Sequence, residues 1–126
     1  MPTAAATEAS TEADKVFQRA AELFAVMSTP MRLKIISALC HGEKNVSQLL
    51  GEIATTQPNM SQHLATLTRS GILARRRDGA QMFYRVQSEK AVTLCRAVCT
   101  QVAIELGNPA AVAPADRLLS ATALGM

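Results

Sequence analysis

The sequence predicts a mainly α-helical fold with one small β-hairpin, an α+β arrangement of five helices and two strands. In five separate segments, apolar residues recur every three or four positions, which is the spacing of one face of a helix. One Asp-Gly pair, Asp78-Gly79, separates two short segments without that spacing and is typical of a hairpin turn. With 126 residues, 48% of them hydrophobic, the chain is long enough for one domain with its own core.

The first two predicted helices span about residues 14–27 and 30–40. Thr29 is the predicted N-cap of the second helix, with Pro30 in its first turn. The apolar face of the first helix consists of Val16, Phe17, Ala20, Leu23, Phe24 and Met27. The second helix is expected to bury Leu33, Ile36 and Leu39, with Cys40 as a further candidate.

Three more helices are predicted over about residues 46–53, 57–69 and 88–106, the last capped by Ser88. A three-residue connection joins the first two of these, and the hairpin follows them. The expected buried residues are Val46, Leu49, Leu50 and Ile53 in the first, and Met60, Leu64 and Leu67 in the second. Helix, short turn, helix and hairpin, flanked by further helices, is the order of a winged helix-turn-helix.

The expected domain covers residues 14–106, between a disordered tail at 1–13 and an Ala/Pro-rich tail at 107–126, where a weak helix near Leu118-Leu119 is possible. The N-terminus lacks the basic start and apolar block of a secretory signal. No apolar run approaches the roughly 18 residues of a membrane span. We therefore expect a cytoplasmic protein without a membrane partner. Cysteines there are more often reduced, metal-binding or redox-active than structural disulfides.

Positive charge is concentrated in one part of the chain. Residues 58–87 contain five arginines and one acid, a net charge of +4 against +3 for the whole chain. Such a segment indicates a basic surface suited to nucleic acid, although a merely solvated arginine-rich hairpin has the same composition.

The helix at 57–69 has an unusual outer face. With its apolar stripe turned inward, this face carries short, mostly neutral hydrogen-bonding side chains. Gln and Asn form paired hydrogen bonds with adenine edges in the major groove, whereas Ser, Thr and His suit phosphates or single acceptors. The helix N-terminus offers backbone N–H groups to a phosphate, and the hairpin arginines suit the adjacent backbone or minor groove. The predicted DNA-binding residues are Gln57, Asn59, Ser61, Gln62, His63, Thr66, Arg69, Arg75, Arg76, Arg77 and Gln81.

Two of these residues carry specific expectations. Gln62 is expected to set the preference for the operator, and Arg76 to strengthen binding to every sequence. His63 lies at the edge of the apolar stripe, so a half-buried structural histidine is an alternative to a DNA contact.

Other function classes find less support in the sequence. The chain has no P-loop, dinucleotide-binding fingerprint, HExxH or nucleophile elbow, so an enzyme is not expected. A winged helix used only for protein contacts explains neither the polar helix nor the basic hairpin beside it.

Two segments of the sequence resemble those of a known family. The segment NVSQLLGEIATTQPNMSQHLATLTRSGILARRRDGAQMFYRV resembles the DNA-binding core of the ArsR/SmtB family of dimeric bacterial repressors, and STPMRLKIISAL resembles its lead-in helix. The resemblance covers about residues 16–104 and is strongest to the biofilm-associated and sulfide-responsive subgroup. It implies a homodimer closed by the first and fifth helices and bound to a two-fold symmetric double-stranded DNA operator. It also implies repression that ends when an inducer binds or reacts.

The sequence departs from two metal-sensing patterns of that family. Arsenic sensors of the founding type carry Cys-Val-Cys where this chain has Asn45-Val46-Ser47. Zinc sensors use Asp, His and Glu across the fifth helix, which has no histidine here. A metal that prefers nitrogen and oxygen ligands is therefore not expected, and neither is a resident cofactor.

The resemblance also bears on the thiols. The sulfide-responsive subgroup pairs a cysteine in the second helix with one in the fifth, at positions near Ser37 and Ala103 of this chain. Cys40 and Cys99 each lie about one turn from those positions, and the two shifts bring them together if the helices are antiparallel.

Three hypotheses remain open for the thiols, and none of them names the inducer. Reactive sulfur or an oxidant could modify Cys40 together with Cys99 or Cys95. The three thiolates could instead hold a soft metal or metalloid ion such as arsenite, cadmium or lead. Finally, the cysteines could only pack in the core, because Cys95 and Cys99 share a predicted stripe with Ala91, Val98, Val102 and Leu106.

Overall fold

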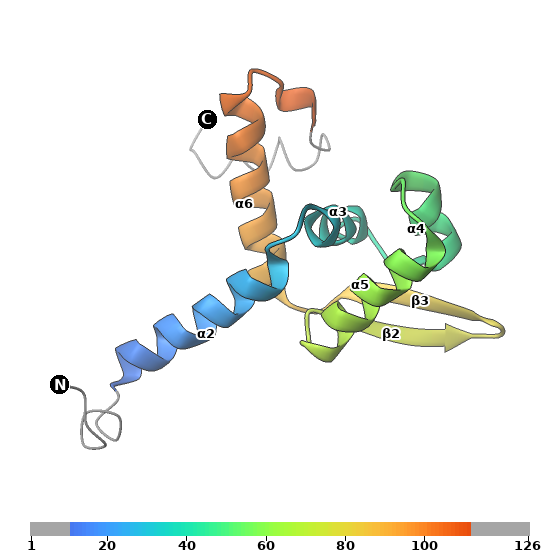
Figure 1. Cartoon of the computed structure of the whole chain (residues 1–126), viewed down its shortest axis with the longest axis horizontal. Helices are drawn as coiled ribbons and strands as arrows, with labels where there is room; N and C mark the ends of the chain where they lie inside the picture. The colour runs from blue at the N-terminus through green and yellow to red at the C-terminus, as the bar shows by residue number, and fades with distance from the viewer. Residues whose placement is uncertain (1–10, 112–126) are drawn as a thin grey trace.

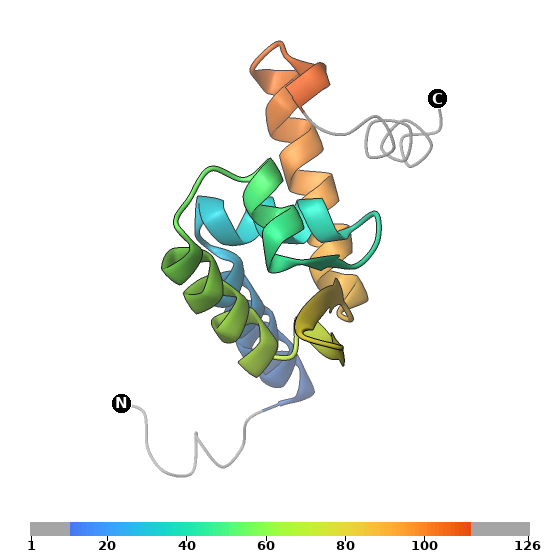
Figure 2. The ribbon, with the colours of Figure 1, turned by 90° about the vertical axis from the view of Figure 1, so that its right-hand side faces the viewer.

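The computed structural model describes residues 11–111, and Figure 1 shows two of its helices projecting from a central group of elements. The elements in chain order are α2 (Glu12–Met27), α3 (Pro30–Leu39), β1 (Lys44–Asn45), α4 (Val46–Glu52), α5 (Gln57–Arg69), β2 (Leu73–Asp78), β3 (Gln81–Val86), α6 (Glu89–Glu105) and the 3-10 helix η1 (Pro109–Ala111). Helices α3, α4 and α5 gather with the hairpin, whereas α2 extends away from them in Figure 1 and α6 extends away in both views (Figures 1 and 2).

The five predicted helices and the hairpin are confirmed, and one helix begins earlier than predicted. Helix α2 begins at residue 12 rather than 14, because Thr11 and Asp14 cap each other reciprocally. The backbone N–H of Asp14 donates to Thr11 Oγ1 and that of Thr11 donates to Asp14 Oδ2, both at 3.1 Å. The predicted N-terminal tail therefore ends earlier than expected, and its remainder lies outside the described residues. The segment with Leu118-Leu119 also lies outside them, and η1 was not expected.

The core lies between α3, α4, α5, the sheet and the first half of α6. Met60, Leu64 and Leu67 of α5 are fully buried, as the periodicity predicted. In α3 the predicted set of buried residues was partly wrong. Ile35 is buried although it was not predicted to be, and Leu33, which was predicted to be buried, is only partly so. The buried core residues are Met27, Ile35, Ile36, Leu39, Leu49, Ile53, Met60, Leu64, Leu67, Ile72, Leu73, Tyr84, Ala91 and Cys95.

The sheet has three strands where the sequence predicted two. Its order is β1-β3-β2, all antiparallel, with Lys44 opposite Tyr84 and Asn45 opposite Phe83. Strand β1 is only two residues long, too short for any alternation of apolar and polar residues to be visible in the sequence. At the hairpin turn, Gly79 has a φ of 64°, a conformation that favours glycine.

Most of the apolar stripe predicted on the first helix is not covered within one chain. Only Met27 of that stripe is buried, and Phe17 is 73% exposed because α2 projects from the domain. The predicted stripe on α6 also divides, since Cys95 faces the core whereas Leu106 is 78% exposed. The large exposed apolar residues of the two helices and their ends are Val16, Phe17, Phe24, Val98, Val102, Ile104 and Leu106. Helical periodicity identifies an apolar face but not what covers it.

Within residues 11–111, no helix is long and apolar enough to cross a membrane.

Candidate nucleic-acid interface

The start of α5 is fixed by hydrogen bonds from its own sequence. Thr56 is the N-cap, and its hydroxyl accepts a hydrogen bond from the backbone N–H of Asn59 at 3.2 Å. The Asn59 side chain donates to Thr55 Oγ1 at 2.8 Å. Asn59, a predicted DNA contact, is therefore half-buried and already orients the helix start.

The outer face of α5 presents several of the predicted residues to solvent. Gln57, Ser61 and Gln62 are exposed, and their side chains form no hydrogen bond within the described part of the chain. Thr66 is half-buried and donates to the carbonyl of Gln62 at 3.1 Å. Arg69, at the end of the helix, reaches Thr66 Oγ1 at 3.4 Å, which is a long contact that leaves most guanidinium donors available. The exposed face thus carries the donors and acceptors that groove recognition needs.

His63 lies on the flank of α5 rather than on its outer face. It is half-buried, and its Nδ1 accepts a hydrogen bond from Arg32 Nε at 3.2 Å. The Nδ1 side of the His63 ring therefore has the structural role that the sequence offered as an alternative to a DNA contact.

The hairpin presents its arginines on two different faces. Strand β2 packs against α5, and its successive side chains alternate between the two sides of the sheet. Arg75 and Arg77 lie on the same side as the buried Leu73 but beyond the core, where both are exposed. Neither guanidinium forms an ion pair with another described residue. Two cationic side chains are thus available on the side of the hairpin that faces α5.

Arg76 lies on the opposite face and is engaged within the chain. Its guanidinium forms a two-pronged ion pair with Glu43, with Nε 2.9 Å and 3.0 Å from the two carboxylate oxygens. It also lies over the Phe83 ring, 4.9 Å from its centroid. The hydrogen bond between the two groups lowers the pKa of Glu43 and raises the pKa of Arg76. On the same face, Gln81 Oε1 accepts from Asn45 Nδ2 at 2.7 Å.

The predicted DNA-binding residues therefore divide into two groups. Six of them have intrachain side-chain partners: Asn59, His63, Thr66, Arg69, Arg76 and Gln81. The expectation that Arg76 strengthens binding to every DNA sequence stays a prediction, and Arg75 and Arg77, which have no ion-pair partner in the described chain, are better placed for that role. Glu43, which sequence reasoning missed, lies next to the hairpin only because β1 pairs with β3.

We expect Gln62→Ala to weaken binding to the operator by about tenfold while leaving binding to unrelated DNA nearly unchanged. A bidentate contact with a base edge contributes about 1–3 kcal/mol of discrimination, and the substitution removes both hydrogen-bonding groups. The side chain is exposed, so the fold should be unaffected. Titration of labelled operator and scrambled DNA measures the ratio. An equal loss on both DNAs would assign Gln62 to the phosphates instead.

The structure brings two of the three cysteines together. Cys95 Sγ lies 3.9 Å from Cys99 Sγ and 3.7 Å from the carbonyl oxygen of Leu33, to which it donates. Cys95 is buried, Cys99 is half-buried, and Cys40 is the half-buried C-cap of α3. Within residues 11–111, no three Cys, His, Asp or Glu side chains form a group suited to a metal ion. The soft-metal hypothesis with three thiolates therefore stays a prediction without geometric support.

Cys99 opens onto a pocket of about 610 Å³ between α3, β1, the end of α4 and α6. Its charged lining residues are Lys34, Lys44 and Glu52, of which Lys44 forms an ion pair with Glu52. The lining residues are Leu33, Lys34, Ser37, Ala38, His41, Lys44, Glu52, Ile53, Ala54 and Cys99. Cys40 is not among them, although it packs against the same core.

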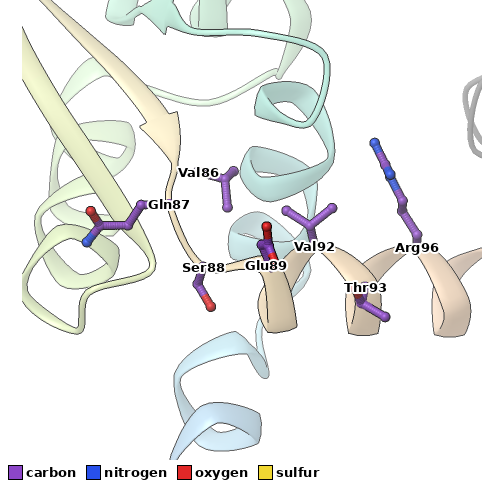
Figure 3. Close-up of a pocket in the computed structure, with 7 residues that line it drawn as sticks. All are labelled: Val86, Gln87, Ser88, Glu89, Val92, Thr93 and Arg96. Carbon is purple, nitrogen blue, oxygen red and sulfur yellow. The ribbon is translucent and has the colours of Figure 1, made fainter.

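A smaller pocket of about 270 Å³ lies where β3 passes into α6. Figure 3 shows Val92 on α6 near Val86 at the end of β3, with Arg96 further along the helix. None of the predicted site residues lines this pocket.

Comparison with known proteins agrees with this geometry. Residues 29–75 match the family model described as bacterial regulatory protein, arsR family. The chain is 38% identical over 92 residues to the biofilm growth-associated repressor of Xylella fastidiosa, a match covering 70% of this chain and 81% of that protein. It is 36% identical over 84 residues to the repressor of the same name from Agrobacterium fabrum, with 64% and 72% covered.

Solved structures give the same answer. The crystal structure of the transcriptional repressor BigR from Xylella fastidiosa superimposes with a TM-score of 0.67 at 37% identity, covering 71% of this chain and 91% of that one. Reduced HlyU from Vibrio cholerae superimposes with a TM-score of 0.66 at 27% identity, covering 72% and 95%. These matches confirm the expectation of a regulator rather than an enzyme. The chain belongs to the ArsR family of bacterial regulatory proteins, DNA-binding transcriptional repressors with a winged helix.

Proposed function

We propose that this repressor is a homodimer that binds a two-fold symmetric operator through α5 and the hairpin of β2 and β3. The observation that carries this proposal is the exposed polar face of α5 beside two exposed arginines without ion-pair partners in the described chain. Gln62 contacts base edges, while Arg75 and Arg77 contact phosphates. Arg69, at the end of the same helix, reaches the phosphates of the flanking backbone.

The proposed dimer interface consists of α2 and α6. Both helices project from the core, and both carry large apolar side chains that this chain leaves exposed. Burying such faces against a second copy removes them from water, which is the usual driving force of a homodimer. A two-fold dimer also places two copies of α5 for the two halves of one operator.

We further propose that a thiol-directed signal, reactive sulfur or an oxidant, releases the operator by modifying Cys99. Cys99 is the thiol that lines the pocket, and Lys34 in the same lining supplies a positive charge for an anionic reagent such as a persulfide. With a persulfide, the Cys99 thiolate attacks the outer sulfur and the donor leaves as a thiolate. With peroxide, it forms a sulfenic acid and hydroxide leaves.

A second cysteine then resolves the modified Cys99. Its thiolate displaces hydrosulfide from a Cys99 persulfide, or its thiol condenses with the sulfenic acid and releases water. Cys95, whose Sγ lies 3.9 Å from that of Cys99, is one candidate for this second cysteine, and Cys40 is the alternative. A direct disulfide needs about 2.05 Å between sulfurs, so closing the 3.9 Å gap within one helix distorts α6. Because α6 belongs to the proposed dimer interface, that distortion would alter the spacing of the two α5 helices.

The test begins with fully reduced protein bound to DNA from upstream of its own gene. An organic persulfide, hydrogen peroxide, arsenite and cadmium are then added separately, with mass spectrometry of each sample. Release by persulfide or peroxide with a modified Cys99 supports the proposal. Release by arsenite or cadmium from unmodified, metal-loaded protein would favour the soft-metal hypothesis. Release by none of the four would leave the cysteines as packing residues.

We expect Cys99→Ser to retain operator binding and to lose release by persulfide and peroxide. The hydroxyl is close in size to the thiol but is not a nucleophile at neutral pH. Cys95→Ser and Cys40→Ser are the matched comparisons, since only the variant that lacks the resolving thiol should stop at a singly modified Cys99. Full release from Cys99→Ser would exclude Cys99 as the reacting group.

A further inference from the structure

One arginine connects three helices around the end of α2. Arg32, in the first turn of α3, donates from Nη1 to the carbonyl oxygen of Val26 in the last turn of α2, at 2.9 Å. From Nε it donates to Nδ1 of His63 on α5, at 3.2 Å. Its own backbone N–H is held by the hydroxyl of Thr29 at 3.1 Å. A single half-buried side chain therefore links α5 to α2 and α3.

The contact with Arg32 also determines where the hydrogen of the His63 ring lies. Every nitrogen of a guanidinium carries hydrogen and none accepts a hydrogen bond. His63 Nδ1 must then be the acceptor and carry no hydrogen. In a neutral imidazole the remaining hydrogen is on Nε2, across the ring from Nδ1.

That hydrogen is available for an external partner. His63 lies between the exposed Gln62 and the buried Leu64, and the residue is half-buried. Within the described residues, no hydrogen bond uses His63 Nε2. The donor therefore lies on the side of the ring away from Arg32, at the edge of the polar face of α5.

We propose that Arg32 is a positioning residue for DNA binding, which holds His63 as the Nε2–H tautomer so that this hydrogen bonds to an operator phosphate. The inference rests on the proposed function, in which α5 binds DNA. It joins the two hypotheses for His63, because one end of the ring is structural and the other contacts DNA. A phosphate contact carries no sequence information, so its loss weakens binding to all duplexes alike.

Two substitutions at His63 separate the two ends of the ring. The amide of asparagine is as many bonds from Cβ as Nδ1, whereas the amide of glutamine is as many bonds from Cβ as Nε2. His63→Asn therefore keeps an acceptor for Arg32 and loses the outward donor. We expect it to melt near the wild-type temperature and to bind operator and scrambled DNA about tenfold more weakly.

The complementary change, His63→Gln, keeps an outward donor and loses the acceptor for Arg32. We expect a lower melting temperature and a smaller loss of DNA affinity than for His63→Asn. Wild-type affinity in His63→Asn would overturn the proposed phosphate contact.

The role of Arg32 is tested by the tautomer itself. Long-range proton–nitrogen NMR spectra show which imidazole nitrogen carries hydrogen, and the exposed His41 provides an internal reference. Arg32→Lys keeps the charge but replaces two donor nitrogens in a rigid planar fork by a single, freely rotating ammonium, which removes the fixed geometry of the two contacts. We expect the spectrum of His63 to change from one tautomer to a mixture, together with weaker DNA binding. An unchanged His63 spectrum in the folded variant would show that Arg32 does not position the ring.

A comparison with other variants separates this inference from the proposed function. Suppose that His63→Asn binds DNA as the wild type does. If Gln62→Ala and the double change of Arg75 and Arg77 to alanine likewise leave DNA binding unchanged, α5 and the hairpin are not the DNA-binding surface. If those variants bind more weakly and His63→Asn does not, only the present inference fails.

Discussion

Phe17→Glu is expected to convert the protein to monomers and to remove stable operator binding. Phe17 is 73% exposed in the single chain, so it contributes little to the core of one protomer. In a two-fold interface the substitution occurs twice. Burying one phenylalanine contributes about 1.5–3 kcal/mol, so removing two weakens the dimer by roughly a hundredfold or more. The buried carboxylates would add to that loss.

Sedimentation equilibrium measures this effect directly, and far-UV circular dichroism checks that the helices remain. Phe17→Leu is the matched control, because leucine keeps the face apolar and should retain the dimer. Glu substitution of an exposed polar neighbour on α2, Gln18→Glu, controls for the added charge. A dimer of unchanged affinity in Phe17→Glu would place the interface elsewhere and leave the apolar face of α2 without a role.

Replacing Arg75 and Arg77 together by alanine is expected to weaken binding to every DNA sequence and to flatten its salt dependence. Each phosphate contact contributes about 0.9 to the slope of log affinity against log salt concentration. Two arginines in each of two protomers therefore account for a change of about 3.6 in that slope. The preference for the operator over scrambled DNA should change little, because phosphates carry no sequence information.

Affinities measured at several salt concentrations give the slope. Lysine at the same two positions should largely preserve it, since the charge is kept. Arg76→Ala provides a comparison within the same strand, and we expect a smaller change because Glu43 already neutralises this guanidinium. A larger change in slope for Arg76→Ala than for the double variant would contradict the division of roles proposed for the hairpin. Arg76 would then be a phosphate contact, as the sequence suggested.

Much of the secondary structure could be predicted because its signals are local. The caps of Thr29, Thr56 and Ser88 are side chains that bond their own helix starts within three residues. The buried stripe of α5 follows from a period of 3.6 residues, and the hairpin from one Asp-Gly pair. The exposed position of Gln62 opposite that stripe follows from the same geometry. For these features, neighbours in sequence are also neighbours in space.

The remaining features depend on residues far apart in the chain. The short strand β1 exists only because β3 pairs with it, and that pairing brings Glu43 to Arg76, 33 positions away. Likewise, Arg32 reaches His63 only because α3 packs against α5, 31 positions later. No local pattern indicates either contact, so the sequence assigned all three consecutive arginines to DNA, whereas the folded sheet pairs Arg76 with Glu43.

The sequence by itself therefore determined the helices, the hairpin, the polar face of α5 and the family resemblance. The helices, the hairpin and the polar face follow from hydrogen bonding and apolar spacing within single segments, whereas the family was indicated by the likeness of the quoted segments to known repressors. The tertiary structure decided which arginines are available, which end of the His63 ring faces outward and that Cys95 and Cys99 lie 3.9 Å apart. It also left the apolar faces of α2 and α6 exposed, because periodicity specifies that a face is apolar and only packing specifies what covers it.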